Sequence, residues 1–112
     1  MKLPLSSRQW IIVGLTAATA VIHLILGFGV IGETNPLFIL NGVGYLVLIV
    51  GLYFLPQLAA QRGLIRWALL GYTAVTFILY FVFNWPEVWG PLGLIDKATE
   101  LILIIMLWLD KE

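Results

Sequence analysis

Apolar residues gather in four segments of this chain, and three short turn-forming stretches separate them. The apolar segments cover residues 9–32, 37–55, 64–84 and 93–109. Each is close to the roughly 20 residues that a helix needs to cross about 30 Å of hydrocarbon. The separating stretches read GETNP, PQLAAQRG and NWPEVWGPLG, and such residues are typical of turns. The pattern predicts four membrane spans joined by short loops.

The spans are predicted to be helices. None shows the period-two alternation of a barrel strand, and backbone in lipid must satisfy its own hydrogen bonds. Asn35 is placed to cap the second helix, and Pro36 to occupy its first turn, where a missing N–H costs nothing. Pro56 and Pro86 mark the ends of the second and third helices. We therefore expect an all-α fold, a single four-helix transmembrane domain covering residues 1–112.

Basic residues outside the predicted helix centres set the expected orientation. Lys and Arg precede the first helix, lie in the second loop and follow the last helix, whereas the first and third loops contain only acidic charge. The basic residues are Lys2, Arg8, Arg62, Arg66 and Lys111, and the acidic ones are Glu33 and Glu87. Because cytoplasmic loops are enriched in basic residues, both termini are expected to be cytoplasmic.

Aromatic residues agree with this orientation, because Trp and Tyr favour the two membrane–water interfaces. The residues expected at the inner interface are Trp10, Tyr53, Trp67 and Trp108, and those at the outer one are Trp85 and Trp89.

The first apolar run, from Trp10 to Ile31, follows basic residues as in a secretory signal. It is long enough for a full span and lacks a small-x-small cleavage site, so we expect a retained helix in the cell membrane.

Composition supports membrane insertion and narrows the functional classes. Apolar residues make up 62% of the chain and charged residues 11%, against about half and about a quarter in soluble domains. The net charge is zero, which argues against nucleic-acid binding. There is no cysteine and one histidine, so disulfides and thiolate metal sites are excluded, and a zinc site is not expected.

The few polar side chains inside the predicted spans fall at one level. At ~1.5 Å per residue, His23 lies roughly 13 Å from the outer end of the first helix, and Glu100 roughly 9–10 Å from the start of the fourth. Spacings of three and four residues put Thr16, Thr19 and His23 on one helix face. We predict a polar cluster in the outer half of the bundle, and its candidate ligand- or proton-binding residues are His23, Asn41, Tyr45, Thr76, Tyr80, Asp96, Lys97 and Glu100.

Structural roles compete with functional ones at these positions. His23 either forms an interhelical hydrogen bond or binds a ligand or proton, and Glu100 either binds or pairs with Lys97 or His23 to fix the helix register. For Asp96 and Lys97 the structural interpretation is favoured, since both are expected in the first helical turn with Lys97 reaching the interface. The positions interpreted as packing or interhelical hydrogen bonding are Asn41, Tyr45 and glycines 14, 42, 44, 51 and 71.

Catalytic and cofactor chemistry has little support in the sequence. His23 could ligate a haem iron or the magnesium of a chlorophyll, but a bis-histidine haem within one chain is excluded. Ser6 and Ser7 lie at the inner terminus, so no Ser-His-Asp set is expected. A carboxylate pair would have to be Asp96 with Glu100 on a single helix. We expect no enzymatic activity, and the cofactor is left undetermined.

Four spans in 112 residues are similar in size and architecture to the small multidrug resistance exporters, which work as dimers around an acidic residue in helix 1. This chain has no carboxylate between Trp10 and Ile31, and the tryptophan-containing signature of that family's third helix is not visible, so their site is not transferred.

The leading hypothesis is a non-enzymatic membrane protein that binds a small polar or lipidic ligand or a partner helix, or serves as an accessory subunit. The alternative is a small proton-coupled transporter or channel that uses Glu100 and His23. Expected partners are the lipid bilayer, other membrane subunits or a second copy.

Overall fold

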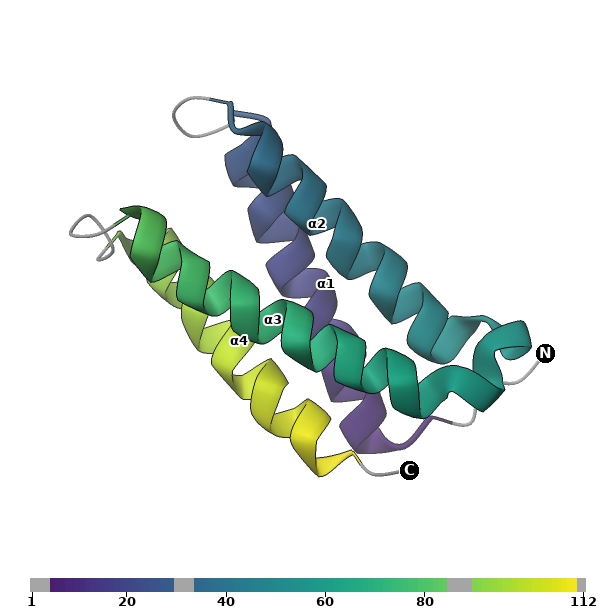
Figure 1. Cartoon of the computed structure of the whole chain (residues 1–112). Coiled ribbons are helices and arrows are strands. Elements are labelled where there is room, and N and C mark those ends of the chain that lie inside the picture. The colour runs from purple at the N-terminus through teal and green to yellow at the C-terminus, as the bar shows by residue number, and fades with distance from the viewer. Residues whose placement is uncertain (1–4, 30–33, 85–89, 111–112) are drawn as a thin grey trace.

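The computed structural model describes residues 5–29, 34–84 and 90–110. Within these ranges the chain is helical, with no β-strand (Figure 1). The α-helices are α1 (Ser7–Gly27), α2 (Pro36–Ile49), α3 (Arg62–Asn84) and α4 (Pro91–Leu109). A π-helix, η1 (Val50–Phe54), extends α2, and a 3₁₀-helix, η2 (Pro56–Gln61), leads into α3.

Helix α1 has defined caps at both ends. Ser6 Oγ accepts a hydrogen bond from the Gln9 N–H at 3.2 Å, and Gln9 Oε1 accepts one from the Ser6 N–H at 3.1 Å, which is a capping box. At the other end Gly29 has φ 77°, a left-handed conformation that stops a helix and suits glycine. The predicted first span to residue 32 is therefore too long, because the helix ends at Gly27.

The start and end of the second helical segment follow the sequence prediction. Asn35 Oδ1 accepts hydrogen bonds from the backbone N–H groups of Leu37 at 3.1 Å and Phe38 at 3.3 Å, with Pro36 in the first turn. The segment ends at Leu55, whose backbone is extended, and Pro56 begins η2. The intervening π-helix was not predicted. Pro86, the expected marker at the end of the third helix, lies outside the described residues.

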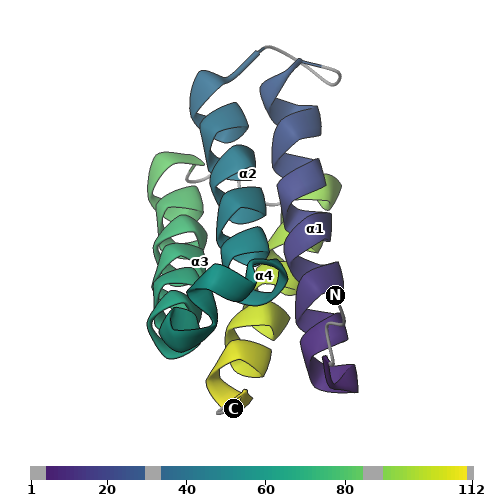
Figure 2. The ribbon, with the colours of Figure 1, turned by 90° about the vertical axis from the view of Figure 1, so that its right-hand side faces the viewer.

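The helices form two hairpins, α1–α2 and α3–α4, that lie side by side (Figures 1 and 2). Glycine allows the close contact within the first hairpin: a Cβ on Gly42 would lie 2.9 Å from the Ala20 carbonyl oxygen. Gly44 packs against the Tyr72 phenol. Gly14 and Gly71, also predicted as packing positions, have no such neighbour, since a Cβ at either would meet nothing within 4 Å.

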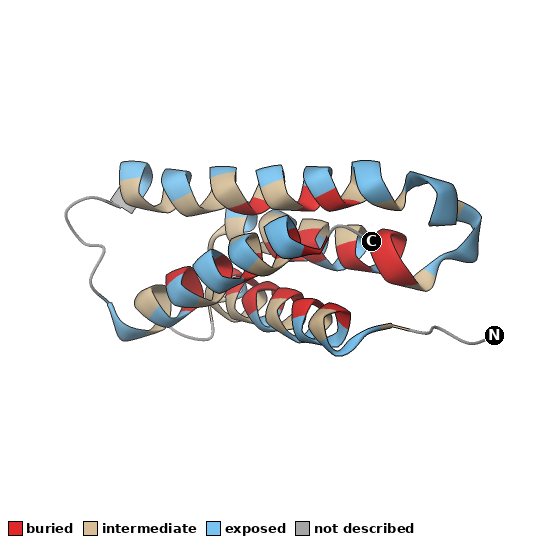
Figure 3. Ribbon diagram, turned by 90° about the horizontal axis from the view of Figure 1, so that it is seen from below, coloured by how far each residue is buried: buried red, intermediate tan, exposed pale blue. Residues whose placement is uncertain are grey.

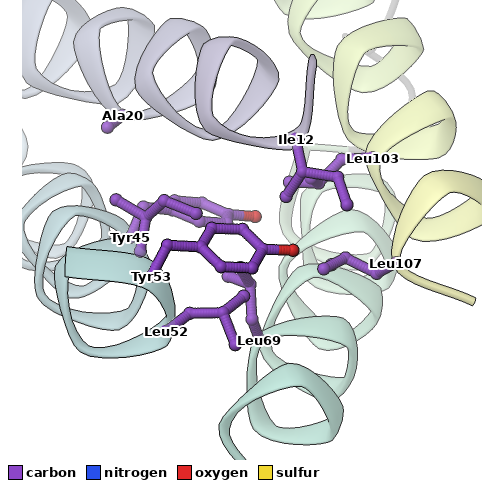
Figure 4. Packing of buried hydrophobic residues seen from close by; sticks show 9 residues of the cluster. Ile12, Ala20, Tyr45, Leu52, Tyr53, Leu69, Leu103 and Leu107 are labelled. Atoms are coloured by element: carbon purple, nitrogen blue, oxygen red, sulfur yellow. The ribbon is translucent and has the colours of Figure 1, made fainter. Parts of the chain in front are cut away.

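Helices α2 and α3 separate toward the N-terminal end of α2 and the C-terminal end of α3 (Figure 1). At the opposite end the bundle closes around buried aliphatic and aromatic side chains (Figure 4). They come from all four helices and include Ile12, Ile49, Leu52, Leu69, Leu103 and Leu107. Buried residues lie on the helix faces that turn toward each other (Figure 3). The hydrophobic core is therefore concentrated toward one end of the bundle.

Three helical segments are long and apolar enough to cross a membrane, Ser7–Gly27, Pro36–Phe54 and Pro56–Phe83. Their outward surfaces are apolar, for example Leu37 (70% exposed) and Phe83 (73% exposed). Exposing such apolar surfaces to water is unfavourable, whereas exposing them to lipid is not. Helix α4 also carries a long apolar run, but Asp96, Lys97 and Glu100 lie within its 19 residues.

Candidate functional site

Helix α4 places three charged side chains inside the bundle. Asp96 is 3% exposed, Lys97 4% and Glu100 0%. The expectation that Asp96 and Lys97 would occupy the first turn, with Lys97 reaching the interface, is wrong. The helix begins at Pro91, so both residues lie in its second turn, where the other helices cover them. Buried charges of this kind require partners.

Lys97 points inward and pairs with both carboxylates. Its ammonium group contacts Glu100 Oε1 one turn further along α4, and it lies 3.4 Å from Asp96 Oδ2. The same ammonium lies 4.7 Å from the centre of the Tyr80 ring, a cation–π contact with α3. The single Lys97 ammonium thus pairs with the carboxyl groups of both Asp96 and Glu100.

Helix α1 adds His23 and Thr19 to these charges. His23 Nδ1 lies 2.8 Å from the Thr19 carbonyl oxygen, which makes Nδ1 the protonated nitrogen. His23 Nε2 then faces Glu100 Oε2 at 3.8 Å. The Thr19 hydroxyl lies 2.5 Å from Asp96 Oδ1 and 3.0 Å from Glu100 Oε2. Thr19 was not among the predicted site residues, although its spacing of four from His23 indicated a shared helix face.

Helix α2 completes the group with Tyr45. The Tyr45 hydroxyl donates to Glu100 Oε2 at 2.9 Å, and its ring lies 5.6 Å from the His23 ring. We refer to this group as the polar cluster, which consists of Thr19, His23, Tyr45, Asp96, Lys97 and Glu100. All six residues are buried. The structure thus brings together residues that are distant in the sequence and come from three helices.

The other predicted site residues lie beside the polar cluster. Tyr80 contacts it through Lys97. Asn41 and Thr76 form a separate pair, in which the Thr76 hydroxyl donates to Asn41 Oδ1 at 3.3 Å. The Tyr72 hydroxyl donates to the Asn41 carbonyl oxygen at 2.8 Å. Asn41 therefore links α2 to α3, in agreement with its predicted role in interhelical hydrogen bonding.

The polar cluster has the spacing of a cation site, and a side chain already supplies the cation. One ligand atom each of His23, Asp96 and Glu100 lies within 4.8 Å of the others. The Lys97 ammonium contacts both carboxylates. It would compete with any metal ion for the same oxygens, so this geometry favours an internal ion pair.

A half-open cavity of about 960 Å³ lies between α2 and α3, next to the polar cluster. His23, Asp96 and Lys97 reach it from one side. Its walls are mostly apolar and include Leu37, Leu40, Val75, Leu79 and Phe83. Gly71 also lines it, and the open space beside Gly71 widens it. We call this space the α2–α3 cavity. It has mostly apolar walls and ionisable side chains at one side.

A second buried polar group lies at the opposite end of the bundle. Asp110, 1% exposed, accepts hydrogen bonds from Arg8 Nη2 at 3.2 Å, Gln9 Nε2 at 3.3 Å and the Tyr53 hydroxyl at 2.6 Å. We call these four residues the terminal clamp. It joins the start of α1, η1 and the end of α4, and it was not predicted from the sequence.

The aromatic residues at this end differ in exposure. Trp10, Trp67 and Trp108 are 50%, 47% and 54% exposed, as befits interface positions. Tyr53 lies at the same end but is 1% exposed, so it does not face the interface as an aromatic anchor. Its hydroxyl is used inside the terminal clamp instead. Trp85 and Trp89 lie outside the described residues.

Comparison of the chain with protein-family models, curated proteins and solved structures finds no match. The geometry of the polar cluster and the α2–α3 cavity therefore carries the functional inference.

Proposed function

We propose that this chain is a non-enzymatic, four-span protein of the cell membrane that binds a small amphiphilic molecule in the α2–α3 cavity, alone or as an accessory subunit of a membrane complex. One observation carries the proposal: an apolar cavity of about 960 Å³ has His23, Asp96 and Lys97 at one side. Such a site offers a wall for an apolar tail and polar partners for a head group.

The cavity volume favours a small ligand over a partner helix. Pockets for small molecules are typically about 300–1,000 Å³. A spanning helix about 10 Å wide and 30 Å long occupies roughly 2,400 Å³, more than twice the available space. The exposed Leu37, Leu40 and Phe83 at the cavity lining would let a lipid-dissolved molecule enter from the side.

A transmembrane position for α4 is supported by where its charges lie. Its 19 residues extend about 28 Å, and its three charged residues before Asp110 are buried in the bundle. The residues it exposes are apolar and include Ile95, Leu101, Ile102 and Ile105. A helix of this kind offers lipid an apolar surface although it carries three charged residues.

A shared cytoplasmic side for both termini is supported by the terminal clamp, which ties the start of α1 to the end of α4. Arg66 lies at the same end, where its guanidinium donates to the Leu107 carbonyl oxygen at 2.6 Å. Because the chain contains no cysteine, single Thr34→Cys and Gln61→Cys variants can be labelled in intact cells. An impermeant thiol reagent should label Thr34→Cys from outside but not Gln61→Cys; the reverse result would invert the topology.

Ligand binding can be tested without knowing the ligand. The protein is purified from its own membrane into lipid nanodiscs and analysed by native mass spectrometry. We expect a bound small molecule of defined mass that is absent from empty nanodiscs. A protein that carries only bulk lipid, in proportion to the lipid of the disc, would contradict the proposal.

A small proton-coupled transporter is the second candidate, because two carboxylates and a histidine lie beside the cavity. Transport would require the core of Ile12, Leu69, Leu103 and Leu107, between the polar cluster and the terminal clamp, to open. Proteoliposome flux that depends on Glu100 would favour this candidate. Ligand binding with zero flux would favour the accessory role.

A pigment bound to His23 is tested by the visible absorption spectrum of the natively purified protein. Both ring nitrogens of His23 already face protein oxygens, at 2.8 Å from the Thr19 carbonyl and 3.8 Å from Glu100 Oε2. Ligation through Nε2 would require Glu100 to move. A haem or chlorophyll band would replace the amphiphile proposal with a pigment-binding function.

A further inference from the structure

The polar cluster has one negative charge too many when its groups take their usual states. With each group counted in its usual state near pH 7, Asp96 and Glu100 are carboxylates, Lys97 is an ammonium and the imidazole of His23 adds no charge. The other titratable groups facing the cluster are the phenols of Tyr45 on α2 and of Tyr72 and Tyr80 on α3, all uncharged at that pH. An unbalanced charge is costly inside a bundle. One additional proton would make the cluster neutral.

The hydrogen bonds around Thr19 identify where this proton is. The Thr19 hydroxyl is 2.5 Å from Asp96 Oδ1 and 3.0 Å from Glu100 Oε2. A hydroxyl carries one hydrogen, so it can donate to only one of the two oxygens. The other contact is a full hydrogen bond if that carboxyl group holds a proton and donates it to Thr19. His23 lies 3.6 Å from Asp96 Oδ2 and 3.8 Å from Glu100 Oε2, beyond hydrogen-bond distance, so these contacts favour one of the two acids as the holder of the proton.

The donors around Glu100 favour its ionised form over that of Asp96. Its Oε2 accepts from the Tyr45 hydroxyl at 2.9 Å, and its Oε1 accepts from the Lys97 ammonium. Both oxygens of Glu100 thus have donors other than Thr19. The remaining arrangement is a chain in which Asp96 donates to Thr19 and Thr19 donates to Glu100. The O···O distance of 2.5 Å at Asp96 is at the short end for such a bond.

Asp96 and Glu100 also differ in their access to the α2–α3 cavity. Asp96 lines the cavity, whereas Glu100 does not. Aromatic rings line the same space, including Phe38, Tyr72, Tyr80 and Phe83. Rings of this kind stabilise a cationic group, as Tyr80 already does for Lys97. The acid that holds the proton is the one that a ligand can reach.

We propose that the α2–α3 cavity binds amphiphilic cations, whose charged head replaces the proton on Asp96. This rests on the proposed ligand-binding function and names its ligand class. The exchange is balanced: the cation enters, the Asp96 O–H bond breaks, the proton leaves to solvent, and the polar cluster stays neutral. The apolar tail lies along the cavity walls formed by α2 and α3.

The experiment uses three probes with the same ten-carbon tail: decyltrimethylammonium, decanesulfonate and neutral decyldimethylamine oxide. Binding to the full chain in zwitterionic nanodiscs is measured at pH 7, and proton release is followed in weak buffer with an impermeant pH dye. A quaternary ammonium has no proton to lose, so released protons must come from the protein. We expect the cation to bind at least about tenfold more tightly than the anion, with about one proton released per cation bound.

Wild-type protein alone provides a further check. If one proton leaves as the cation binds, affinity for decyltrimethylammonium should rise with pH, by up to about tenfold per unit. The Asp96→Asn variant should release no proton and lose at least about tenfold in cation affinity, while its affinity for the amine oxide stays within about twofold. If Asp96→Asn does not fold, the wild-type pH dependence still decides.

The outcomes separate the two proposals. If the amine oxide binds and the cation binds no better, without proton release, the cation proposal is overturned and the amphiphile site stands. If none of the three probes binds, both proposals fail.

Discussion

The polar cluster and the terminal clamp are two buried acidic sites built in a similar way, at opposite ends of the bundle. In each, a tyrosine from the second helical segment donates to a carboxylate of the fourth: Tyr45 to Glu100 at 2.9 Å, and Tyr53 to Asp110 at 2.6 Å. In each, the start or middle of α1 supplies further polar partners. The shared design makes their differences informative.

The two sites differ in charge balance and in access. The terminal clamp sets one carboxylate against one guanidinium, and both oxygens of Asp110 accept hydrogen bonds. The polar cluster sets two carboxylates against one ammonium, and three of its residues line a cavity. A buried polar group that is balanced and fully bonded needs no ligand to explain it. An unbalanced one beside a cavity indicates a function.

The largest effect is expected from breaking the terminal clamp. Asp110→Ala leaves the buried Gln9 amide and Tyr53 hydroxyl without their acceptor, so the free energy of unfolding should fall by about 3 kcal/mol. Denaturant titration in detergent, followed by circular dichroism, measures this. Binding of decyldimethylamine oxide by the folded fraction should not change. Thr99→Ala is the control, since the Thr99 hydroxyl bonds only to its own helix at Ile95; a similar loss in both variants would refute a special role for the clamp.

Substitutions of the two acids of the polar cluster should lower the free energy of unfolding by different amounts. Glu100→Gln weakens the bonds from Thr19, Tyr45 and Lys97, and should lower the free energy of unfolding by about 1.5 kcal/mol. Asp96→Asn keeps the Lys97–Glu100 pair and replaces a neutral acid with a neutral amide, so it should cost about 0.5 kcal/mol or less. The same unfolding titration compares them. If Asp96→Asn is the more costly change, the proton is misplaced in this account.

Filling the α2–α3 cavity should abolish binding without loss of stability. A Cβ at Gly71 would meet nothing within 4 Å, and Gly71 lines the cavity. Gly71→Trp should weaken binding of decyldimethylamine oxide at least about tenfold, about 1.4 kcal/mol, while helix propensity offsets any strain. Gly14→Trp is the matched control on α1, where space is equally open. Equal binding by both variants would place the ligand elsewhere.

Much of the fold could be predicted from the apolar segments and the turn-forming residues between them, because a helix that crosses lipid must be long and apolar. Asn35 and Pro36 act locally, and the cap forms as expected. The first helix ends early because the positive φ of Gly29 overrides an apolar run that continues past it. The π-helix before Leu55 was not predicted, and one of its residues, Tyr53, bonds to the distant Asp110, a contact that local sequence cannot indicate.

The candidate site was harder to predict because it depends on how the helices are placed along one another. Helical spacing correctly put His23 on the face of Thr19, and Asp96 on the face of Glu100. It could not show that α4 begins early enough to bury Lys97. The terminal clamp joins residues about a hundred positions apart, which no local spacing indicates.

Site-resolved photolabelling can show directly whether a bound amphiphile lies between α2 and α3. A decyldimethylamine oxide analogue with a diazirine at the end of its tail is crosslinked in nanodiscs, and the labelled residues are mapped by mass spectrometry. We expect label on cavity residues such as Leu40, Val75 and Leu79, and excess unlabelled probe should remove it. Label spread evenly over lipid-facing positions such as Ile78 and Ile105, unaffected by competitor, would contradict it.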